Sequence, residues 1–205
     1  MTTRTLAVAT AGLSVPSSTR LLADRLSAAT VDALGERGID AVVEVVELRE
    51  HARDLADHLL TGFPSERLGE AIATVEGADG VIAVSPVFSA SYSGLFKTFV
   101  DVLDKDALSG APVLVGATAG TERHSLVLEH AMRPLFSYLR AVVVPTAVFA
   151  ASSDWAGGDR AEAELGERVR RAGGELAAAV AANPPRGRRD PFAEPTSFED
   201  LLRGR

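Results

Sequence analysis

Hydroxylated side chains cluster near the start of this 205-residue chain, where an apolar run gives way to a helical repeat. The segment TAGLSVPSSTR follows the run TLAVAT and contains four such residues, Ser14, Ser17, Ser18 and Thr19. A helix start exposes free backbone N–H groups and the positive end of the helix dipole, which together suit an anion. Serine is also a preferred helix cap when no ligand binds. Four hydroxyls at one helix start, with Arg20 in its first turn, favour a phosphate site.

A second segment, SPVFSASYSGLFK, places small residues between an apolar strand and an apolar helix. The short side chains between Ser85 and Ser93 would let a flat ligand approach the backbone N–H groups. Phe88 and Tyr92 offer apolar contact to an aromatic ring. The alternative is a serine-rich loop that caps the next helix.

A third segment, ATAGTERHS, follows another apolar run and again combines small side chains with backbone donors. Its residues Thr118, Ala119, Gly120 and Thr121 suit the pyrimidine edge of a flavin, although a loop that only caps the next helix would look the same. Three donor-rich segments with few charges fit a ligand that carries a phosphate and a large neutral ring.

Several other kinds of site are excluded by what the sequence lacks. It contains neither the G-x-x-x-x-G-K-[ST] phosphate loop nor the G-x-G-x-x-G dinucleotide fingerprint. It has no cysteine, which removes disulfides, thiol redox chemistry and cysteine-ligated zinc. His51 and His58 show no ligand spacing with nearby acids, so no metal site is expected. The net charge of -7 argues against a nucleic-acid partner.

Apolar runs typical of strands alternate with segments of helical periodicity. Strands are predicted at 5–10, 40–48, 80–84, 112–118 and 141–149 with a break at Pro145, and helices at 17–35, 68–77, 95–103, 124–139 with a bend at Pro134, and 159–182. The region 49–64 is unassigned, except that DLADHLL could form a short helix.

This alternation predicts an α/β fold with a parallel sheet and helices on both faces. Five strands fit the flavodoxin-like three-layer α/β/α sandwich, with the strand order 2-1-3-4-5. In such sheets the ligand lies beyond the carboxyl ends of the strands, at the switch point between the first and third strands. The three segments above follow the first, third and fourth strands, so they are expected to meet there.

The chain is expected to form one domain over residues 1–182, followed by a Pro/Arg-rich tail at 183–205. The tail is either flexible or docks through its apolar residues, Phe192, Phe198, Leu201 and Leu202. No apolar run approaches the roughly 20 residues that span a bilayer, and no signal segment precedes the first strand. A cytoplasmic protein is therefore expected.

Three stretches, ADGVIAVSPVFSASYSGLFKTFVD, ALSGAPVLVGATAGTERH and AMRPLFSYLRA, together resemble the NAD(P)H-dependent FMN reductase family. Within that family the chain is most similar to the reductases that supply reduced FMN to alkanesulfonate and other luciferase-like monooxygenases. The similarity spans roughly residues 4 to 150. Two departures stand out: relatives often have Gly-Ser-x-Arg where this chain reads Gly12-Leu13-Ser14-Val15, and many have Tyr at Phe88.

The resemblance implies FMN as cofactor and NADPH or NADH as reductant. It implies that the first segment binds the FMN phosphate, that the second lies along the ring and that the third lies near its pyrimidine end. The residues concerned are Ser14, Ser17, Ser18 and Thr19, then Pro86, Val87, Phe88 and Ser89, then Thr118, Ala119, Gly120 and Thr121. Tyr92 stands where reductases of this branch carry a tyrosine linked to flavin exchange and subunit contacts.

The predicted function is that of an NAD(P)H:FMN oxidoreductase, in which hydride passes from nicotinamide to flavin without a catalytic acid or base from the protein. Reduced FMN would then leave for a partner flavin-dependent monooxygenase. The alternatives on this fold are a quinone or azo reductase with tightly bound FMN, a flavodoxin-type electron carrier, and a protein that has lost its flavin. The resemblance also implies a homodimer or homotetramer, which suits the wide apolar stripe at Leu95, Phe96, Phe99 and Leu103.

Overall fold

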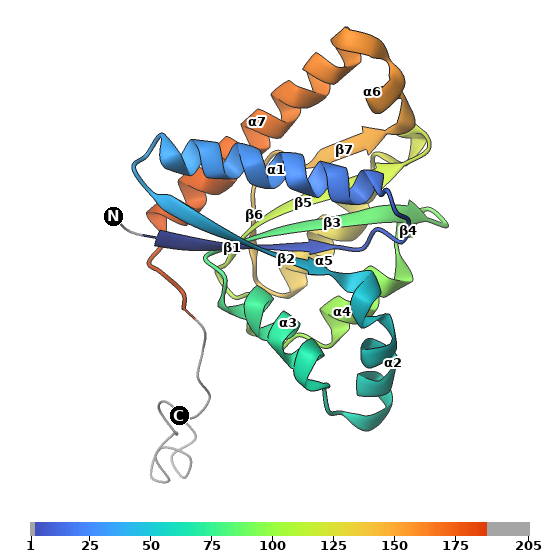
Figure 1. Ribbon diagram of the computed structural model, residues 1–205, viewed down its shortest axis with the longest axis vertical. Helices are drawn as coiled ribbons and strands as arrows, with labels where there is room; N and C mark the ends of the chain where they lie inside the picture. Colours follow the sequence, from blue (N-terminus) through green and yellow to red (C-terminus); the bar gives the residue numbers. More distant parts are fainter. Residues whose placement is uncertain (1–2, 188–205) are drawn as a thin grey trace.

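The computed structural model describes residues 3–187, which form a sheet covered by helices on both faces (Figure 1). In chain order the elements are β1 (Thr3–Thr10), α1 (Ser18–Gly35), β2 (Asp40–Glu47), η1 (Leu48–His51), α2 (Ala52–Thr61), α3 (Glu66–Gly77), β3 (Gly80–Phe88), β4 (Ser91–Tyr92), α4 (Gly94–Asp101), β5 (Pro112–Ala119), η2 (Glu122–His124), η3 (Leu128–Met132), α5 (Arg133–Tyr138), β6 (Val142–Val143), β7 (Val148–Ala151), α6 (Ser152–Ala156) and α7 (Gly158–Ala182).

The predicted flavodoxin-like sheet is confirmed, with its parallel strands in the order β2-β1-β3-β5-β6. The fifth strand of the prediction consists of two short strands, β6 and β7, which both pair with β5 on either side of Pro145. Proline lacks a donor for the ladder, so it interrupts the pairing there. The central strands β3 and β5 are buried on both faces and are mostly apolar, with Ser85 and Thr118 near their carboxyl ends as buried polar residues.

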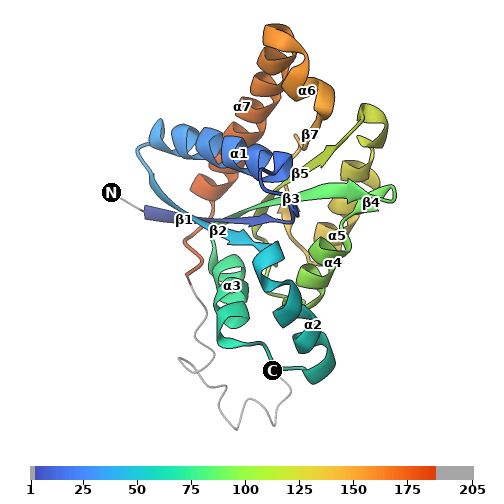
Figure 2. The same ribbon diagram turned by 45° about the vertical axis from the view of Figure 1, so that its right-hand side comes forward.

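The helices α1 and α7 cover one face of the sheet, and α3, α4 and α5 cover the other (Figure 2). On the first face, Leu22 and Leu26 of α1 pack with Leu176 of α7. These two helices approach so closely that a Cβ at Gly173 would lie 2.8 Å from the backbone of Ala29. The first helix is therefore fixed rigidly above the sheet, and its start lies at the carboxyl end of β1.

The wide apolar stripe of α4 packs against the chain's own core. Phe96 and Phe99 are each 1% exposed, and the Phe96 ring contacts Phe136 of α5 at a centroid distance of 6.2 Å. The expectation that part of this stripe meets another subunit is therefore wrong for Phe96, Phe99 and Leu103, which are all buried here.

The segment after the third strand also differs from the expected open loop. β3 continues to Phe88, and β4 returns against it, with Val87 opposite Tyr92 and Phe88 opposite Ser91. Only Ser89 and Ala90 connect the two strands, and both have positive φ values, 49° and 66°. Positive φ at both turn positions is the geometry of a type I′ hairpin, which usually selects Asn-Gly. The Ser-Ala turn carries no such signal, so the hairpin was not predictable from it.

The helix predicted at 124–139 is present only as η3 and α5, from Leu128 to Tyr138, while η2 ends at His124. The N–H of Arg133 bonds to the carbonyl of Leu128, five residues back, which makes the turn before α5 a π-helical one. Pro134 lies in the first turn of α5, where its missing N–H costs nothing. Where a bend at Pro134 was predicted, the chain has a π-helical turn followed by a new helix.

After α7 the chain crosses the amino end of the sheet. Arg4 donates to the carbonyl of Asn183 at 2.7 Å, and the N–H of Arg186 donates to Asp79 at 2.8 Å. The apolar tail residues from Phe192 onward lie outside the described residues. Within residues 3–187, no helix combines the length and the apolar character that a membrane crossing requires.

Candidate functional site

An open pocket of about 360 Å³ lies where the predicted segments meet, at the carboxyl ends of β1, β3 and β5. Its lining contains Ser14, Ser17, Ser18, Thr19, Pro86, Val87, Phe88, Thr118, Ala119 and Gly120 from the predicted set, together with Leu13 and Ser152. Ser89, Tyr92 and Thr121 are not part of this lining. The pocket thus combines all three segments at the switch point of the sheet, where the fold places ligands.

The first loop is folded tightly onto the start of α1. Ser17 caps this helix, because its Oγ accepts the N–H of Arg20 at 3.2 Å. Gly12 makes the fold of the loop possible: a Cβ there would lie 2.0 Å from Ser17 Oγ and 3.2 Å from Thr19 Cβ. The peptide bond between Val15 and Pro16 is cis. This arrangement leaves the N–H groups of the first turn of α1 at the pocket, where an anion is stabilised.

Two threonine hydroxyls join the first loop to the third. Thr19 Oγ1 and Thr118 Oγ1 lie 2.8 Å apart, and both side chains are buried. Because Thr19 belongs to α1 and Thr118 to β5, this hydrogen bond fixes the two walls of the pocket relative to each other. Both residues therefore have a structural role, and their roles toward a ligand stay predictions.

A buried hydroxyl beneath the first loop has no hydrogen-bond partner among the described residues. Thr10 is fully buried at the carboxyl end of β1, and its Oγ1 is unsatisfied. Alternation along β1 places Thr10 on the same face as Leu6 and Val8, which is the face covered by α1. A buried polar group without a partner is costly, so this atom is suited to a further polar partner near the start of α1. With the hydroxyls of Ser14, Ser17 and Ser18 in the pocket lining and this unpartnered hydroxyl beneath the loop, the donors of the site fit a phosphate.

Two serines of the second segment, Ser85 and Ser93, form hydrogen bonds within the protein. Ser85 Oγ accepts the N–H of Ser93 at 2.9 Å, and Ser93 Oγ accepts the N–H of Phe96 at 3.1 Å. These two buried serines hold β4 and the start of α4 in place. Pro86, Val87 and Phe88 form this wall of the pocket, and Phe88 is 47% exposed.

Beyond β5, the third segment contributes backbone more than side chains. Ala119 and Gly120 line the pocket, whereas Thr121 Oγ1 accepts the N–H of Arg123 at 3.4 Å and so caps η2. Ser152 follows β7 and reaches the same pocket. The sequence analysis did not predict Ser152 as a site residue. Its position directly after the last parallel strand could have indicated it, because that loop lies at the same edge of the sheet.

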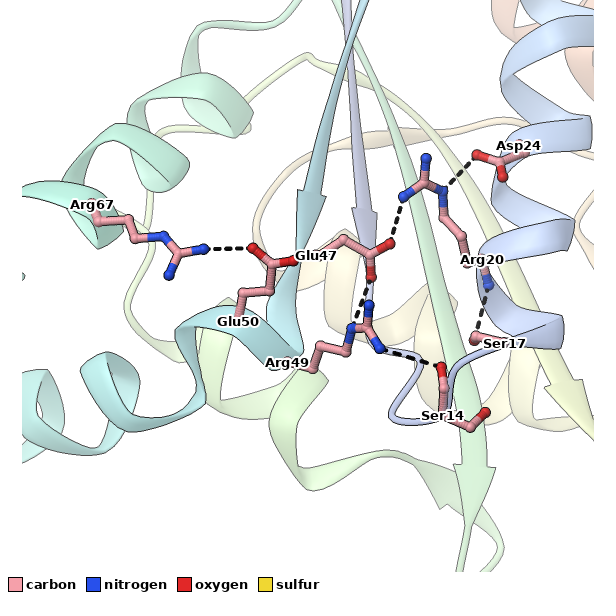
Figure 3. Close-up of polar contacts among 8 residues, drawn as sticks. All are labelled: Ser14, Ser17, Arg20, Asp24, Glu47, Arg49, Glu50 and Arg67. Carbon is pink, nitrogen blue, oxygen red and sulfur yellow. Dashed lines mark hydrogen bonds and ion pairs between the residues drawn. The ribbon is translucent and has the colours of Figure 1, made fainter.

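Among residues 3–187, no charged side chain contributes to the lining of this pocket. Arg20, which the sequence places beside the phosphate site, is bound instead by two carboxylates: Asp24 at 2.7 Å and Glu47 (Figure 3). The hydrogen bonds to Asp24, and then to Glu47, raise the pKa of Arg20 above its usual value. The groups available to an anion at this pocket are therefore hydroxyls, backbone N–H groups and the helix dipole.

A larger groove, of about 620 Å³, lies between α1 and α7. Its walls carry Arg25, Asp32 and Arg37, and it lies along the helices rather than at the strand ends. Mixed charges and the absence of converging loops make it a poor site for a neutral ring. The pocket at the strand ends is therefore the candidate site.

The fold is flavodoxin-like, and its candidate site is an open pocket lined by hydroxyls and small residues at the carboxyl ends of the strands. The NADPH-dependent FMN reductase family matches residues 4–156, and the chain belongs to that family. Its members are oxidoreductases with FMN and NAD(P)H as reactants, which confirms the predicted class of enzyme.

Individual relatives agree with this assignment. The chain is 37% identical over 159 residues to the NADH-dependent FMN reductase SfnE of Pseudomonas putida, covering 78% of this chain and 83% of the relative. It is 39% identical over 140 residues to an FMN reductase (NADPH) of Pseudomonas aeruginosa, covering 68% and 73%. Among solved structures, an oxidoreductase from Corynebacterium diphtheriae has a TM-score of 0.86 at 48% identity, covering 90% of this chain and all of the other.

Proposed function

We propose that this chain reduces FMN with NADH or NADPH at the pocket described above, and that it supplies reduced FMN to a separate flavin-dependent monooxygenase. The convergence of three donor-rich segments on one uncharged pocket carries this proposal. Bound FMN would supply the hydride-accepting ring. The names of the relatives include both NADH- and NADPH-dependent reductases, so both reductants belong in the test.

The residues of the pocket have distinct roles in this proposal. The N–H groups at the start of α1, with Ser14, Ser17 and Ser18, bind the phosphate. Pro86 to Phe88 support one face of the ring, and the backbone at Ala119 and Gly120 binds its pyrimidine edge. The open side of the pocket leaves the other face free for a nicotinamide.

Transfer to a partner requires that FMN exchange readily. A phosphate bound only by neutral donors lacks the cation–anion pairing that an arginine or lysine side chain would add. The uncharged lining therefore favours a flavin that binds and leaves over one that is held permanently. This feature favours the reductase over a quinone or azo reductase that keeps its FMN.

A coupled measurement tests the proposal. Oxidation of NADH and of NADPH is followed with and without added FMN, and the mixture is then passed through a gel-filtration column. Rapid oxidation that depends on added FMN, with the yellow colour lost on the column, is expected. Retained colour, with activity only when a quinone is supplied, would replace the proposal with the quinone reductase.

The homodimer or homotetramer remains a prediction from the family resemblance alone. The buried residues Phe96, Phe99 and Leu103 no longer support it. Sedimentation with and without FMN measures the mass directly; a monomer under both conditions would reject it.

A further inference from the structure

Two arginines border the first loop, and both are bound by one carboxylate. Glu47 ends β2, and its side chain pairs with Arg20 and, at 3.7 Å, with Arg49 (Figure 3). The side chain of Glu47 is only 16% exposed, whereas those of Arg20 and Arg49 are 37% and 30% exposed. Glu47 is thus the least exposed member of this ionic cluster.

The cluster lies directly beside the phosphate part of the pocket. Arg49 Nη1 is 3.5 Å from the carbonyl oxygen of Ser14, which lines the pocket. Arg20 lies in the first turn of α1, and its own N–H bonds to Ser17 Oγ. Strand register explains the position of Glu47, because it is paired with Thr10 at the end of β1.

This arrangement keeps two cations at the edge of the site without using them in it. Asp24 accepts a hydrogen bond from Arg20 Nε at 2.7 Å, so the guanidinium of Arg20 is bound by Asp24 as well as by Glu47. The Arg49 guanidinium lies between Glu47 and a carbonyl oxygen, both of them acceptors. Neither arginine contributes to the lining of the pocket. The negative charge of Glu47 also opposes a phosphate dianion nearby.

We propose that Glu47 determines how loosely this chain holds FMN, by binding Arg20 and Arg49 and so withholding their charges from the phosphate. The proposal rests on the function proposed above and assigns a positioning role to a residue outside the pocket. In the wild type, the phosphate meets hydroxyls and N–H groups. Without the Glu47 charge, Arg49 is free to turn from the Ser14 carbonyl toward the phosphate.

The isosteric variant Glu47→Gln tests this role. FMN and riboflavin, which lacks the phosphate, are each titrated by quenching of flavin fluorescence at low and moderate salt. We expect FMN to bind about tenfold more tightly, the scale of one added charge-assisted hydrogen bond. The affinity for riboflavin should be unchanged, and the gain for FMN should shrink with added salt.

Three further variants serve as controls. Glu50→Gln breaks the neighbouring ion pair with Arg67, which does not involve the first loop, and should leave both affinities unchanged. Glu47→Asp retains the charge and should retain wild-type affinity. Adding Arg49→Gln to Glu47→Gln should remove most of the gain, because the freed cation is then absent.

The outcomes separate this inference from the proposed function. Wild-type protein that binds neither flavin would overturn both. Wild-type protein that binds FMN, combined with a Glu47→Gln variant of equal or lower FMN affinity, would overturn the role of Glu47 alone. A parallel change in FMN and riboflavin affinity would also overturn it, because it would indicate a general structural effect.

Discussion

The hydroxyl groups of Thr19 and Thr118 lie 2.8 Å apart in the interior, where they join the start of α1 to the end of β5. These residues are 99 positions apart in the sequence, yet they form the contact between two walls of the candidate flavin pocket. The pocket therefore depends on a buried hydrogen bond as well as on its loops.

Replacing Thr118 by Val should destabilise the protein and weaken FMN binding. The change keeps the side-chain shape but leaves the buried Thr19 hydroxyl without its partner, at a cost of about 1–3 kcal/mol. The midpoint of thermal unfolding should fall by about 2–4 °C for each kcal/mol lost in a chain of this size. Thr118→Ser retains the hydroxyl and should remain close to wild type; equal losses in both variants would contradict the role of the bond.

Gly12→Ala should weaken FMN binding and stability together. The added Cβ would displace Ser17 Oγ from its cap on α1, and loss of such a cap costs about 1 kcal/mol. FMN titration and chemical unfolding measure the two effects. Gly94→Ala is the matched control, since a Cβ there meets nothing within 4 Å. A Gly12→Ala variant that behaves like this control would reject the tight packing of the first loop.

The hairpin turn beside the pocket should be improved by Ala90→Gly. Ala90 has a φ of 66°, a left-handed conformation that costs a residue with a Cβ about 1–2 kcal/mol. Chemical unfolding should show a more stable variant, by about 0.5–1 kcal/mol after the added flexibility of the unfolded chain is subtracted. Ser91→Gly, at an extended position of β4, should be destabilising instead. The opposite ranking would contradict the turn geometry.

Stability should decrease as the pH falls below the ordinary pKa of histidine, partly because of His51. Burial, and then the charge of Arg67, lower the pKa of His51, against the opposing effects of Asp54 and Glu50. The unfolded chain then takes up the proton first, so the stabilisation present at neutral pH is lost as the pH falls toward the lowered value. Urea unfolding between neutral and mildly acidic pH measures this slope. His51→Gln should flatten this slope; an unchanged slope in that variant would show that other groups cause it.

Much of the fold was predictable because its strands are buried and parallel. Such strands are continuous apolar runs, as at 80–84 and 112–118, and their alternation with helices indicates a parallel sheet, for which five strands fit the flavodoxin-like order. The same logic brought Ser17, Pro86 and Thr118 to one pocket, because the carboxyl ends of parallel strands share an edge.

The remaining features depend on tertiary contacts that periodicity does not encode. The width of the α4 stripe was clear, but pattern alone does not distinguish the chain's own core from a partner's surface. The Ser89-Ala90 turn adopts a conformation that its residue types disfavour. Arg20 is held by an ion pair with Glu47, which lies 27 residues away at the end of β2, so the sequence around Arg20 does not reveal it.

A crystal structure with FMN tests the central claim most directly. The account predicts the phosphate within hydrogen-bond distance of the N–H groups that begin α1, and the ring along Pro86, Val87 and Phe88. FMN in the groove between α1 and α7, or with its phosphate away from the first loop, would contradict it.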